Sequence, residues 1–416
     1  MTTWNHNDPL QFGVGIEDTF IADEASGRRK LDEYELTQHN VFWQADLDKA
    51  AESGAQFLRW GIPWYRVNPE PGRWDFSWVD RVVERLHERG LRLVVDLMHY
   101  GTPLWLEGSF ANTDYPKLVA DYAHRVAERY HGAVSDFTPL NEPLLNVIYC
   151  GEFGAWPPLL TGDAGFARVL RGAARGIVET QAAIRAAQGA EASFVHVEAS
   201  YRFAGAVEQN ADTVEFLRQR AFIVEDLVTG GVGPEHPLAD YLARNGFSDD
   251  DLAWHQQTTA VPDVMGVNYY PAVSTELFVE GPNPRGDLHD PRPRVDAGTE
   301  GLKEVLSAFA ERYGRPVMLS ETSAPGTPAE RIRWLDESVT AVDELRAAGV
   351  PVVGYTWWAV FGWINWDYRE GTAPVEQYLN TNGLWNLELD AAGVFQRVPT
   401  PVIDAYRAHA RRNETR

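Results

Sequence analysis

The sequence of 416 residues contains one cysteine, no long apolar run and fewer basic than acidic residues. Cys150 stands alone, so it cannot form a disulfide within the chain or build a thiolate metal site. No stretch approaches the roughly 20 apolar residues that a membrane-spanning helix needs. The first residues, Met1 to His6, lack the basic and apolar segments of a signal peptide. We therefore expect a cytoplasmic protein.

Basic charge is scarce. The chain has 37 Lys and Arg against 60 Asp and Glu, a formal net charge of −23. Nucleic acids and anionic membrane surfaces are bound through basic surfaces. The composition therefore excludes nucleic acid and membrane as partners.

Aromatic residues, in contrast, are abundant: 15 Trp, 16 Tyr and 18 Phe. Many of them stand beside Gly, Pro and polar residues instead of inside apolar runs. Aromatic rings at such junctions offer flat apolar faces. This pattern suggests a ligand that is itself a flat ring.

Short apolar segments recur along the whole chain and have the length and composition of buried strands. The eight segments are Phe12–Ile16, Phe57–Ile62, Arg92–Met98, Val134–Leu140, Phe194–Val197, Val264–Tyr269, Pro316–Ser320 and Val352–Trp357.

Apolar residues at helical spacing lie between these segments. One such set runs from Val79 to Leu86 and is followed by Gly90, and another runs from Ile332 to Leu345 and is followed by Gly349. Glycine just past the last apolar residue is typical of a helix end. Strands that alternate with helices imply a parallel sheet.

Eight strand–helix units predict an α/β fold, a (β/α)₈ TIM barrel. The alternative, a doubly wound open sheet, usually has a G-x-G-x-x-G turn after its first strand. Here Gly13 and Gly15 lack the third glycine. No Pro/Ser-rich linker divides the chain, so we expect one domain over residues 1–416. The stretch Glu280–Asp296 is predicted to be a long loop on the active face of the barrel.

Two glutamates follow predicted strands. Glu142 follows the fourth strand within Asn141-Glu142-Pro143, and Glu321 ends the seventh. A single Glu in such a place is usually a solvated loop residue. However, the carboxyl ends of all barrel strands meet at one face, so these two can point into one cavity. Two carboxylates across a cavity suit glycoside hydrolysis: one protonates the leaving oxygen, and the other attacks the sugar or activates water.

The segment Thr138–Pro143 resembles the Asn-Glu-Pro motif of family 1 glycoside hydrolases, the β-glucosidase-like members of the clan A barrels. Further segments match that family in order along nearly the whole chain. They are Leu58–Pro69 around the second strand, His99 after the third, Gly266–Tyr270 on the sixth, Pro316–Glu321 on the seventh and Trp358–Trp366 after the eighth.

This resemblance implies a retaining β-glycosidase that acts by double displacement, with Glu142 as general acid/base and Glu321 as nucleophile. Glu142 would start protonated and Glu321 ionised, so their surroundings should separate the two pKa values. Retention also predicts that the two carboxyl groups lie about 5–5.5 Å apart. The family usually removes single sugars from chain ends, which favours exo action on a small glycoside or oligosaccharide.

The resemblance implies roles for other residues too. Each of these would contact the sugar or position Glu321: Arg59 and Tyr270 beside the nucleophile, Asn141 on the sugar 2-hydroxyl, His99 on another hydroxyl, and Trp358 and Trp366 as floor and wall of the subsite. No cofactor is implied, and His6, His39 and His99 do not stand at the spacing of metal ligands.

Several positions depart from the family pattern. The first-strand Gln has no counterpart, and this chain offers Glu17 and Asp18 there. Tyr100 replaces the Trp that usually follows the third-strand His. Asn365 replaces the Glu of a Glu-Trp pair that reads the sugar 4- and 6-hydroxyls. We expect Glu17 and Asn365 to contact the substrate, but the identity of the sugar stays open.

Two alternatives remain at this level. The same carboxylate pair could transfer the glycosyl group to an acceptor, as a transglycosidase. The barrel could also bind carbohydrate without turnover.

Four more residues are candidates for contacts with outer parts of the substrate. They are Glu198 and three aromatic residues on loops after strands, Trp105, Trp156 and Trp363.

Overall fold

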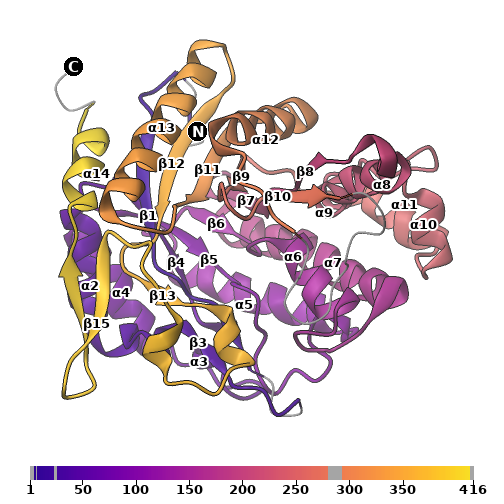
Figure 1. Ribbon diagram of the computed structural model, residues 1–416. Helices are drawn as coiled ribbons and strands as arrows, with labels where there is room; N and C mark the ends of the chain where they lie inside the picture. Colours follow the sequence, from indigo (N-terminus) through magenta and orange to yellow (C-terminus); the bar gives the residue numbers. More distant parts are fainter. Residues whose placement is uncertain (1–3, 6, 23–25, 280–292, 413–416) are drawn as a thin grey trace.

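Eight parallel strands form a closed barrel in the computed structural model, which describes residues 4–5, 7–22, 26–279 and 293–412 (Figure 1). In order around the barrel, the strands are β1 (Gln11–Gly15), β4 (Phe57–Gly61), β5 (Arg92–Asp96), β6 (Asp136–Thr138), β7 (Ser193–Ala199), β9 (Val264–Asn268), β11 (Val317–Thr322) and β12 (Val352–Trp358). Strand β12 pairs with β1 and closes the ring.

The prediction of a (β/α)₈ TIM barrel is confirmed. Each predicted strand overlaps one barrel strand, although several ends differ. The fourth segment was expected over Val134–Leu140, and regular pairing covers only Asp136–Thr138. Residues beyond Thr138 continue by single bonds, such as Asn141 N to Met98 O at 2.9 Å. Apolar runs therefore locate the strands, whereas the ends depend on pairing with neighbours.

Helices surround the barrel (Figure 1). The main ones are α2 (His39–Glu52), α4 (Ser77–Glu88), α5 (Tyr115–Arg129), α7 (Gly162–Gln188), α12 (Gly298–Tyr313), α13 (Pro328–Ala347) and α14 (Val402–Ala410). Shorter helices lie in the connections: α1 (Glu33–Leu36), α3 (Trp64–Val67), α6 (Pro143–Val147), α8 (Ala211–Arg220), α9 (Ile223–Val228), α10 (Ala239–Arg244) and α11 (Asp249–Gln257).

Two predicted helix patterns are confirmed as α4 and α13. Helix α4 buries Val79, Val82, Val83 and Leu86, and Gly90 follows it with φ +66°. Helix α13 begins with a capping box in which Thr327 and Glu330 satisfy each other's backbone N–H groups. Their apolar stripes pack toward the barrel because that is where apolar surface can be buried.

Small two-stranded sheets form in the connections outside the barrel. They pair β2 (Phe20–Ile21) with β3 (Leu31–Asp32), β8 (Arg202–Gly205) with β10 (Thr275–Phe278), β13 (Trp363–Ile364) with β14 (Leu379–Asn380), and β15 (Trp385–Leu389) with β16 (Phe395–Pro399). The stretch Glu280–Asp296, predicted as a long loop, lies mostly outside the described residues. Among the described helices, none is both long and apolar enough to cross a membrane.

Glycines let large rings fill the inside of the barrel. A Cβ on Gly13 would lie 2.2 Å from the Phe57 ring, and one on Gly15 would lie 1.9 Å from the Trp358 ring. Phe57 and Trp358 are both buried. The two glycines of β1 are therefore required by packing, whereas the sequence offered them only as part of an incomplete nucleotide-binding pattern.

Gly13→Ala should lower the free energy of unfolding by about 1–3 kcal/mol, because the added methyl overpacks a buried ring. Urea unfolding followed by fluorescence measures this. Gly231→Ala is the control, since its Cβ would meet its nearest atom at 3.4 Å, an ordinary contact. Equal stability of the two variants would contradict the packing role of Gly13.

Candidate active site

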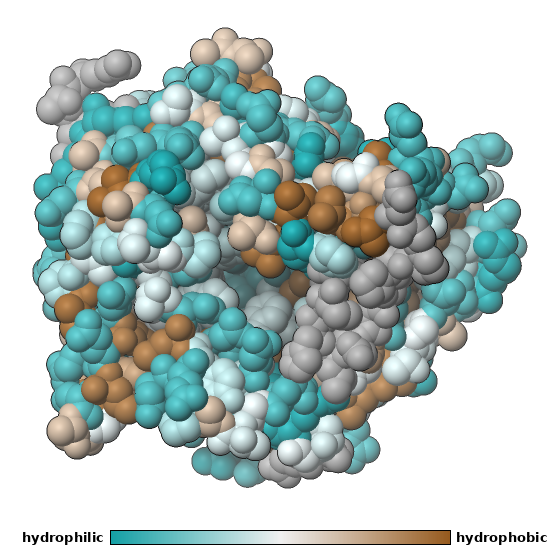
Figure 2. Space-filling model, in the orientation of Figure 1, coloured by the Kyte–Doolittle hydropathy of each residue, from teal (hydrophilic) through white to brown (hydrophobic). Residues whose placement is uncertain are grey.

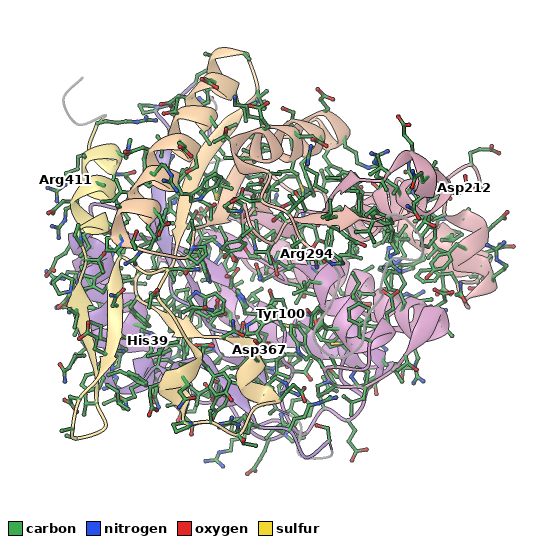
Figure 3. All side chains as sticks on the ribbon, in the orientation of Figure 1. His39, Tyr100, Asp212, Arg294, Asp367 and Arg411 are labelled. Carbon is green, nitrogen blue, oxygen red and sulfur yellow. The ribbon has the colours of Figure 1, made fainter. Side chains whose placement is uncertain are left out.

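A cavity of about 430 Å³ opens at the carboxyl ends of the barrel strands. Figure 2 shows the hollow at the centre of this face, and in Figure 3 Tyr100, Arg294 and Asp367 lie around the same region. The volume falls within the range of small-molecule sites. The predicted site residues that line it are Glu17, His99, Glu142, Tyr270, Glu321, Asn365 and Trp366.

Three other predicted residues belong to the layer of side chains beneath the lining. Arg59 and Asn141 have no exposed surface, and Trp358 is 1% exposed. Trp358 was expected as the floor of the sugar site. Its indole N–H donates to Glu17 at 2.8 Å, and its ring stacks on His99 with centroids 5.8 Å apart. Trp358 therefore supports two lining residues.

A β-bulge aims Glu321 into the cavity. Between Leu319 and Glu321, β11 has one residue more than the facing part of β9, and an irregularity at the same place interrupts its pairing with β12. A bulge breaks the alternation of side chains along a strand. Ser320 Oγ donates to Asn268 at 2.7 Å, while Glu321 contacts Arg59 and Tyr270. Because of the bulge, the side chains of the consecutive residues Ser320 and Glu321 both contact residues of this site.

Two donors hold the carboxylate of Glu321. Arg59 Nη1 donates to Oε1 at 2.8 Å, and the Tyr270 hydroxyl donates to Oε2 at 2.8 Å. Both donors favour the ionised form of the carboxyl group. Each oxygen is thus fixed by its own partner, which orients Glu321.

Arg59 connects Glu321 to the opposite side of the barrel. Its Nη2 atom donates to Asp96 at 2.8 Å and to Asn141 at 3.0 Å. Burial alone would lower the pKa of Arg59, but Asp96 and Glu321 raise it above its usual value. A buried cation is therefore stable here because two carboxylates surround it.

Glu142 is presented by a sharp turn of the backbone. Its φ of +44° lies in the left-handed region, and Pro143 starts α6 directly after it. Its backbone N–H donates to Val197 O at 2.9 Å. Its carboxyl Oε1 accepts from Asn268 Nδ2 at 2.8 Å, and Oε2 accepts from the Tyr100 hydroxyl. Non-glycine residues adopt this backbone conformation rarely, and often at functional sites.

The two glutamates have different electrostatic surroundings. Burial is the main cause that raises the pKa of Glu142. Burial also raises the pKa of Glu321, but the Arg59 cation acts against it there. Since two buried carboxyls in one site do not both ionise easily, the pair retains a proton to higher pH than isolated carboxyls. The Arg59 guanidinium contacts Glu321 and not Glu142, so of the two carboxyl groups it directly favours the anion of Glu321.

One cluster of acidic residues and a histidine lies behind Glu17. Among the described residues, Asp18, Asp96 and His99 could converge on a metal ion. However, His99 Nδ1 lies 3.0 Å from Asp18 Oδ1, and Asp96 is paired with Arg59. Asp18 and Asp96 are therefore already paired with basic side chains of the protein, His99 and Arg59.

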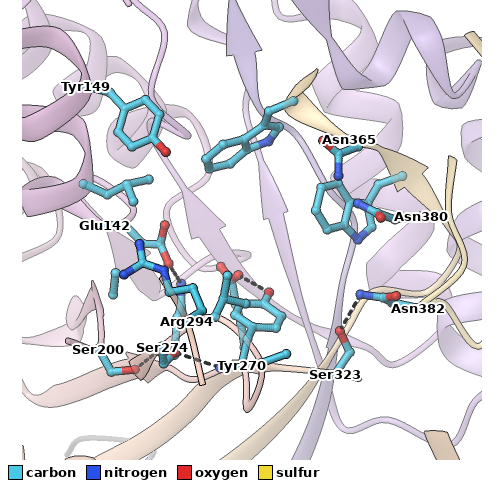
Figure 4. Close-up of a pocket in the computed structure, with 18 of the residues that line it drawn as sticks. Glu142, Tyr149, Ser200, Tyr270, Ser274, Arg294, Ser323, Asn365, Asn380 and Asn382 are labelled. Carbon is cyan, nitrogen blue, oxygen red and sulfur yellow. Dashed lines mark hydrogen bonds between the residues drawn. The ribbon is translucent and has the colours of Figure 1, made fainter. Parts of the chain in front are cut away.

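Amide side chains line the side of the cavity opposite Glu142 (Figure 4). Asn365 Oδ1 accepts from Asp367 N at 2.9 Å and caps a short helix. Asn382 donates to Ser323 at 3.2 Å, and Asn380 lies beside them. This bond orients the side chain of Asn365 at the edge of the cavity.

Of the four residues predicted for the outer parts of the site, two line the cavity and two do not. Trp156 and Trp363 line the cavity, whereas Trp105 borders a different depression beside Trp74. Glu198 is buried, and both of its oxygens accept from Leu144 N, at 3.3 and 3.1 Å. It holds the start of α6 and does not line the cavity.

Sequence reasoning did not include Asp96, Tyr100 and Asn268 among the site residues. Asp96 and Asn268 are polar residues at the ends of predicted strands, the same signal that identified Glu142 and Glu321. Tyr100 was noted only as a departure from a family pattern. Its contact with Glu142 depends on how two strand ends approach each other, which no local pattern reveals.

Comparison with known proteins agrees with the fold and the cavity. The sequence profile described as "Glycosyl hydrolase family 1" matches residues 13–371. The chain belongs to glycosyl hydrolase family 1. It is an O-glycosyl hydrolase, and the resemblance noted in its motifs is confirmed.

Curated relatives in this family are distant. A "Beta-glucosidase-like SFR2, chloroplastic" from Oryza sativa subsp. japonica is 25% identical over 400 residues, which cover 86% of this chain but only 56% of the rice protein. "Beta-glucosidase A" from Thermotoga maritima is 23% identical over 363 residues, or 80% of this chain and 79% of that protein. The chain thus spans about half the length of the rice relative and most of the bacterial one.

Solved structures show the same architecture. The family 1 β-glucosidase from Thermotoga maritima superposes with a TM-score of 0.78 at 19% identity and covers 99% of both chains. At this identity, the similarity shows the fold alone.

Tyr270→Phe should raise the pKa of Glu321, because it removes one of the two donors that favour the ionised carboxylate. If the ionised form of Glu321 is the reactive one, the acid limb of the pH profile of kcat/KM should move up by about one pH unit. Steady-state rates across pH measure it.

Tyr355→Phe is a matched control for this experiment, since it removes a buried hydroxyl that faces Ser338 at 2.9 Å, outside the cavity. An acid limb that stays in place in Tyr270→Phe would show that the phenol does not tune Glu321.

Proposed function

We propose that this family 1 enzyme is a retaining β-glycosidase in which Glu321 is the nucleophile and Glu142 is the general acid/base. The observation that carries this proposal is that both carboxyls line one cavity, while the buried Arg59 cation contacts Glu321 and not Glu142. One carboxyl is thus favoured as an anion and the other as an acid, which is the division that double displacement requires.

In the first step, a Glu321 oxygen would attack the anomeric carbon as the bond from that carbon to the aglycone oxygen breaks. Glu142 would give its proton to the departing oxygen. The products are a glycosyl ester on Glu321, the free aglycone and a Glu142 carboxylate. Arg59 and Tyr270 orient the nucleophile for this attack.

In the second step, the Glu142 carboxylate would take a proton from a water molecule, whose oxygen attacks the same carbon. The ester bond breaks, the sugar leaves with its original anomeric configuration, and Glu321 is again ionised. The contact of Asn141 with the sugar 2-hydroxyl stays a prediction from the sequence, since Asn141 has no exposed surface and its amide nitrogen faces His99 and Tyr100.

The substrate is proposed to be a small β-glycoside or oligosaccharide that is cut from one end. The β-glucosidase relatives and the volume of the cavity, about 430 Å³, support this. We propose that the choice of sugar depends on the side-chain amides of Asn365, Asn380 and Asn382, of which Asn365 stands where the family has a carboxylate reader. A panel of nitrophenyl glycosides of both anomeric configurations identifies it.

Glu321→Ala should abolish turnover of an activated nitrophenyl β-glycoside, because no group is left to form the glycosyl ester. Glu142→Ala should lose about 10²–10⁴-fold in kcat/KM with a poor leaving group and much less with an activated one. Steady-state kinetics of both variants, with circular dichroism as a check of folding, separate these roles. Wild-type rates in Glu321→Ala would refute the assignment of the nucleophile.

The stereochemical outcome is a separate test. Proton NMR of the first-formed product should show the β-anomer if the mechanism retains configuration. An α-anomer at early times would indicate single displacement, and the predicted carboxyl separation of about 5–5.5 Å would then be wrong as well.

Glycosyl transfer is a second candidate, favoured by one relative: the "Galactolipid galactosyltransferase SFR2, chloroplastic" from Arabidopsis thaliana is 22% identical over 381 residues, 80% of this chain and 53% of that protein. The same ester on Glu321 would then react with an alcohol or sugar instead of water. Product analysis with and without added acceptor distinguishes the two outcomes.

A cytoplasmic location stays a prediction from the sequence, and cell fractionation tests it.

A further inference from the structure

Tyr100 stands at a position where the family usually has a tryptophan, and its hydroxyl reaches the carboxyl group of Glu142. The hydroxyl donates to Glu142 Oε2 and accepts from Asn141 Nδ2 at 3.1 Å. A tryptophan has no hydroxyl, so this contact is a property of this chain. Tyr100 is 2% exposed and lines the cavity.

The backbone is bent to make this contact. Tyr100 has φ +79° and Glu142 has φ +44°, so both partners lie in the left-handed region. Such residues cost about 1–3 kcal/mol each and persist where the surroundings hold them. The surroundings of Tyr100 are specific: its backbone pairs with Phe20, and its ring contacts Trp156 and Trp366 at centroid distances of 5.0 and 5.5 Å.

The phenol remains a donor. Burial, reinforced by the charge of Glu142, raises the pKa of Tyr100 well above its usual range. The hydroxyl has one proton, and it accepts a bond from Asn141, so that proton is directed to Glu142. A donor to a carboxylate stabilises the ionised form, which makes the carboxyl group a stronger acid.

We propose that Tyr100 is a positioning residue for the general acid/base: its hydroxyl orients Glu142 and stabilises the carboxylate that forms when the leaving oxygen takes the proton. The mirror arrangement exists at the nucleophile, where the Tyr270 hydroxyl donates to Glu321. Each carboxyl of the pair thus has its own phenol. This inference rests on the proposed function, because it assigns Glu142 the role of acid.

Other charged groups also face Glu142. They are His99 and Glu17 from the ends of β5 and β1, Glu321 on β11, Glu198 on β7, and Arg294, which lines the same cavity. Asn268 donates to the other oxygen. None of these groups changes when only the Tyr100 hydroxyl is removed, so a shift in titration reports that hydroxyl.

The test is Tyr100→Phe, with Tyr100→Leu as a second variant whose side chain also has no donor. Loss of the donor raises the pKa of Glu142, so the acid stays protonated to higher pH. The alkaline limb of kcat/KM should therefore move up by about one pH unit in both variants. The probe is the 4-nitrophenyl β-glycoside on which the wild-type enzyme is most active.

A second readout is the leaving group. A weaker acid slows the methyl β-glycoside by about tenfold, whereas a dinitrophenyl β-glycoside, which needs little proton transfer, stays within about twofold. Tyr355→Phe controls for loss of a buried hydroxyl and should keep both limbs. Tyr270→Phe should move the acid limb instead.

An alkaline limb that coincides with wild type in either folded Tyr100 variant would overturn the proposal, as would equal slowing of the methyl and dinitrophenyl glycosides. If Tyr100→Phe does not fold, Tyr100→Leu decides alone. Absence of any turnover by the wild-type enzyme would overturn the proposed function itself, which is a different result from an active enzyme whose limb does not move.

Discussion

The ion pairs of Arg59 are the constraint on which the site depends. One guanidinium binds Glu321 and Asp96 at 2.8 Å each and also reaches Asn141 and the backbone of Ser320. Arg59 itself lies on β4, and its partners come from β5, the end of β6, and β11 with its bulge. Removal of one partner from a buried ion pair costs about 3–5 kcal/mol, so the residues of four strand ends are held in one arrangement.

This cation also explains why two similar carboxyls can do different work. Both glutamates are buried, and burial opposes ionisation of each. Arg59 relieves that cost for Glu321 only, and Glu142 is instead held by an amide and a phenol. The separation of roles therefore comes from what surrounds each carboxyl group, and the phenols of Tyr100 and Tyr270 refine it.

The other half of the cavity has changed relative to the family. Asn365 replaces an expected carboxylate, and its side-chain oxygen accepts a hydrogen bond that caps a short helix. A change from a carboxylate to an amide alters which sugar hydroxyls a site can match, because unmatched polar groups are costly. At the catalytic end the two glutamates match the family pattern, whereas Tyr100 beside Glu142 and Asn365 across the cavity depart from it.

The sequence by itself determined the barrel and predicted that two carboxyl groups meet at one end of it. Eight apolar runs separated by helical patterns allow few other folds, and the strand ends of a barrel share one face, so Glu142 and Glu321 could be placed together from spacing alone. Only the tertiary structure decided the rest: the bulge that turns Glu321 inward, the place of Trp358 beneath the lining, the help that Glu198 gives to α6, and the bond from Tyr100 to Glu142. These features depend on distances of a few ångströms between segments far apart in the chain, and such distances are set by packing of the whole barrel and not by any local pattern.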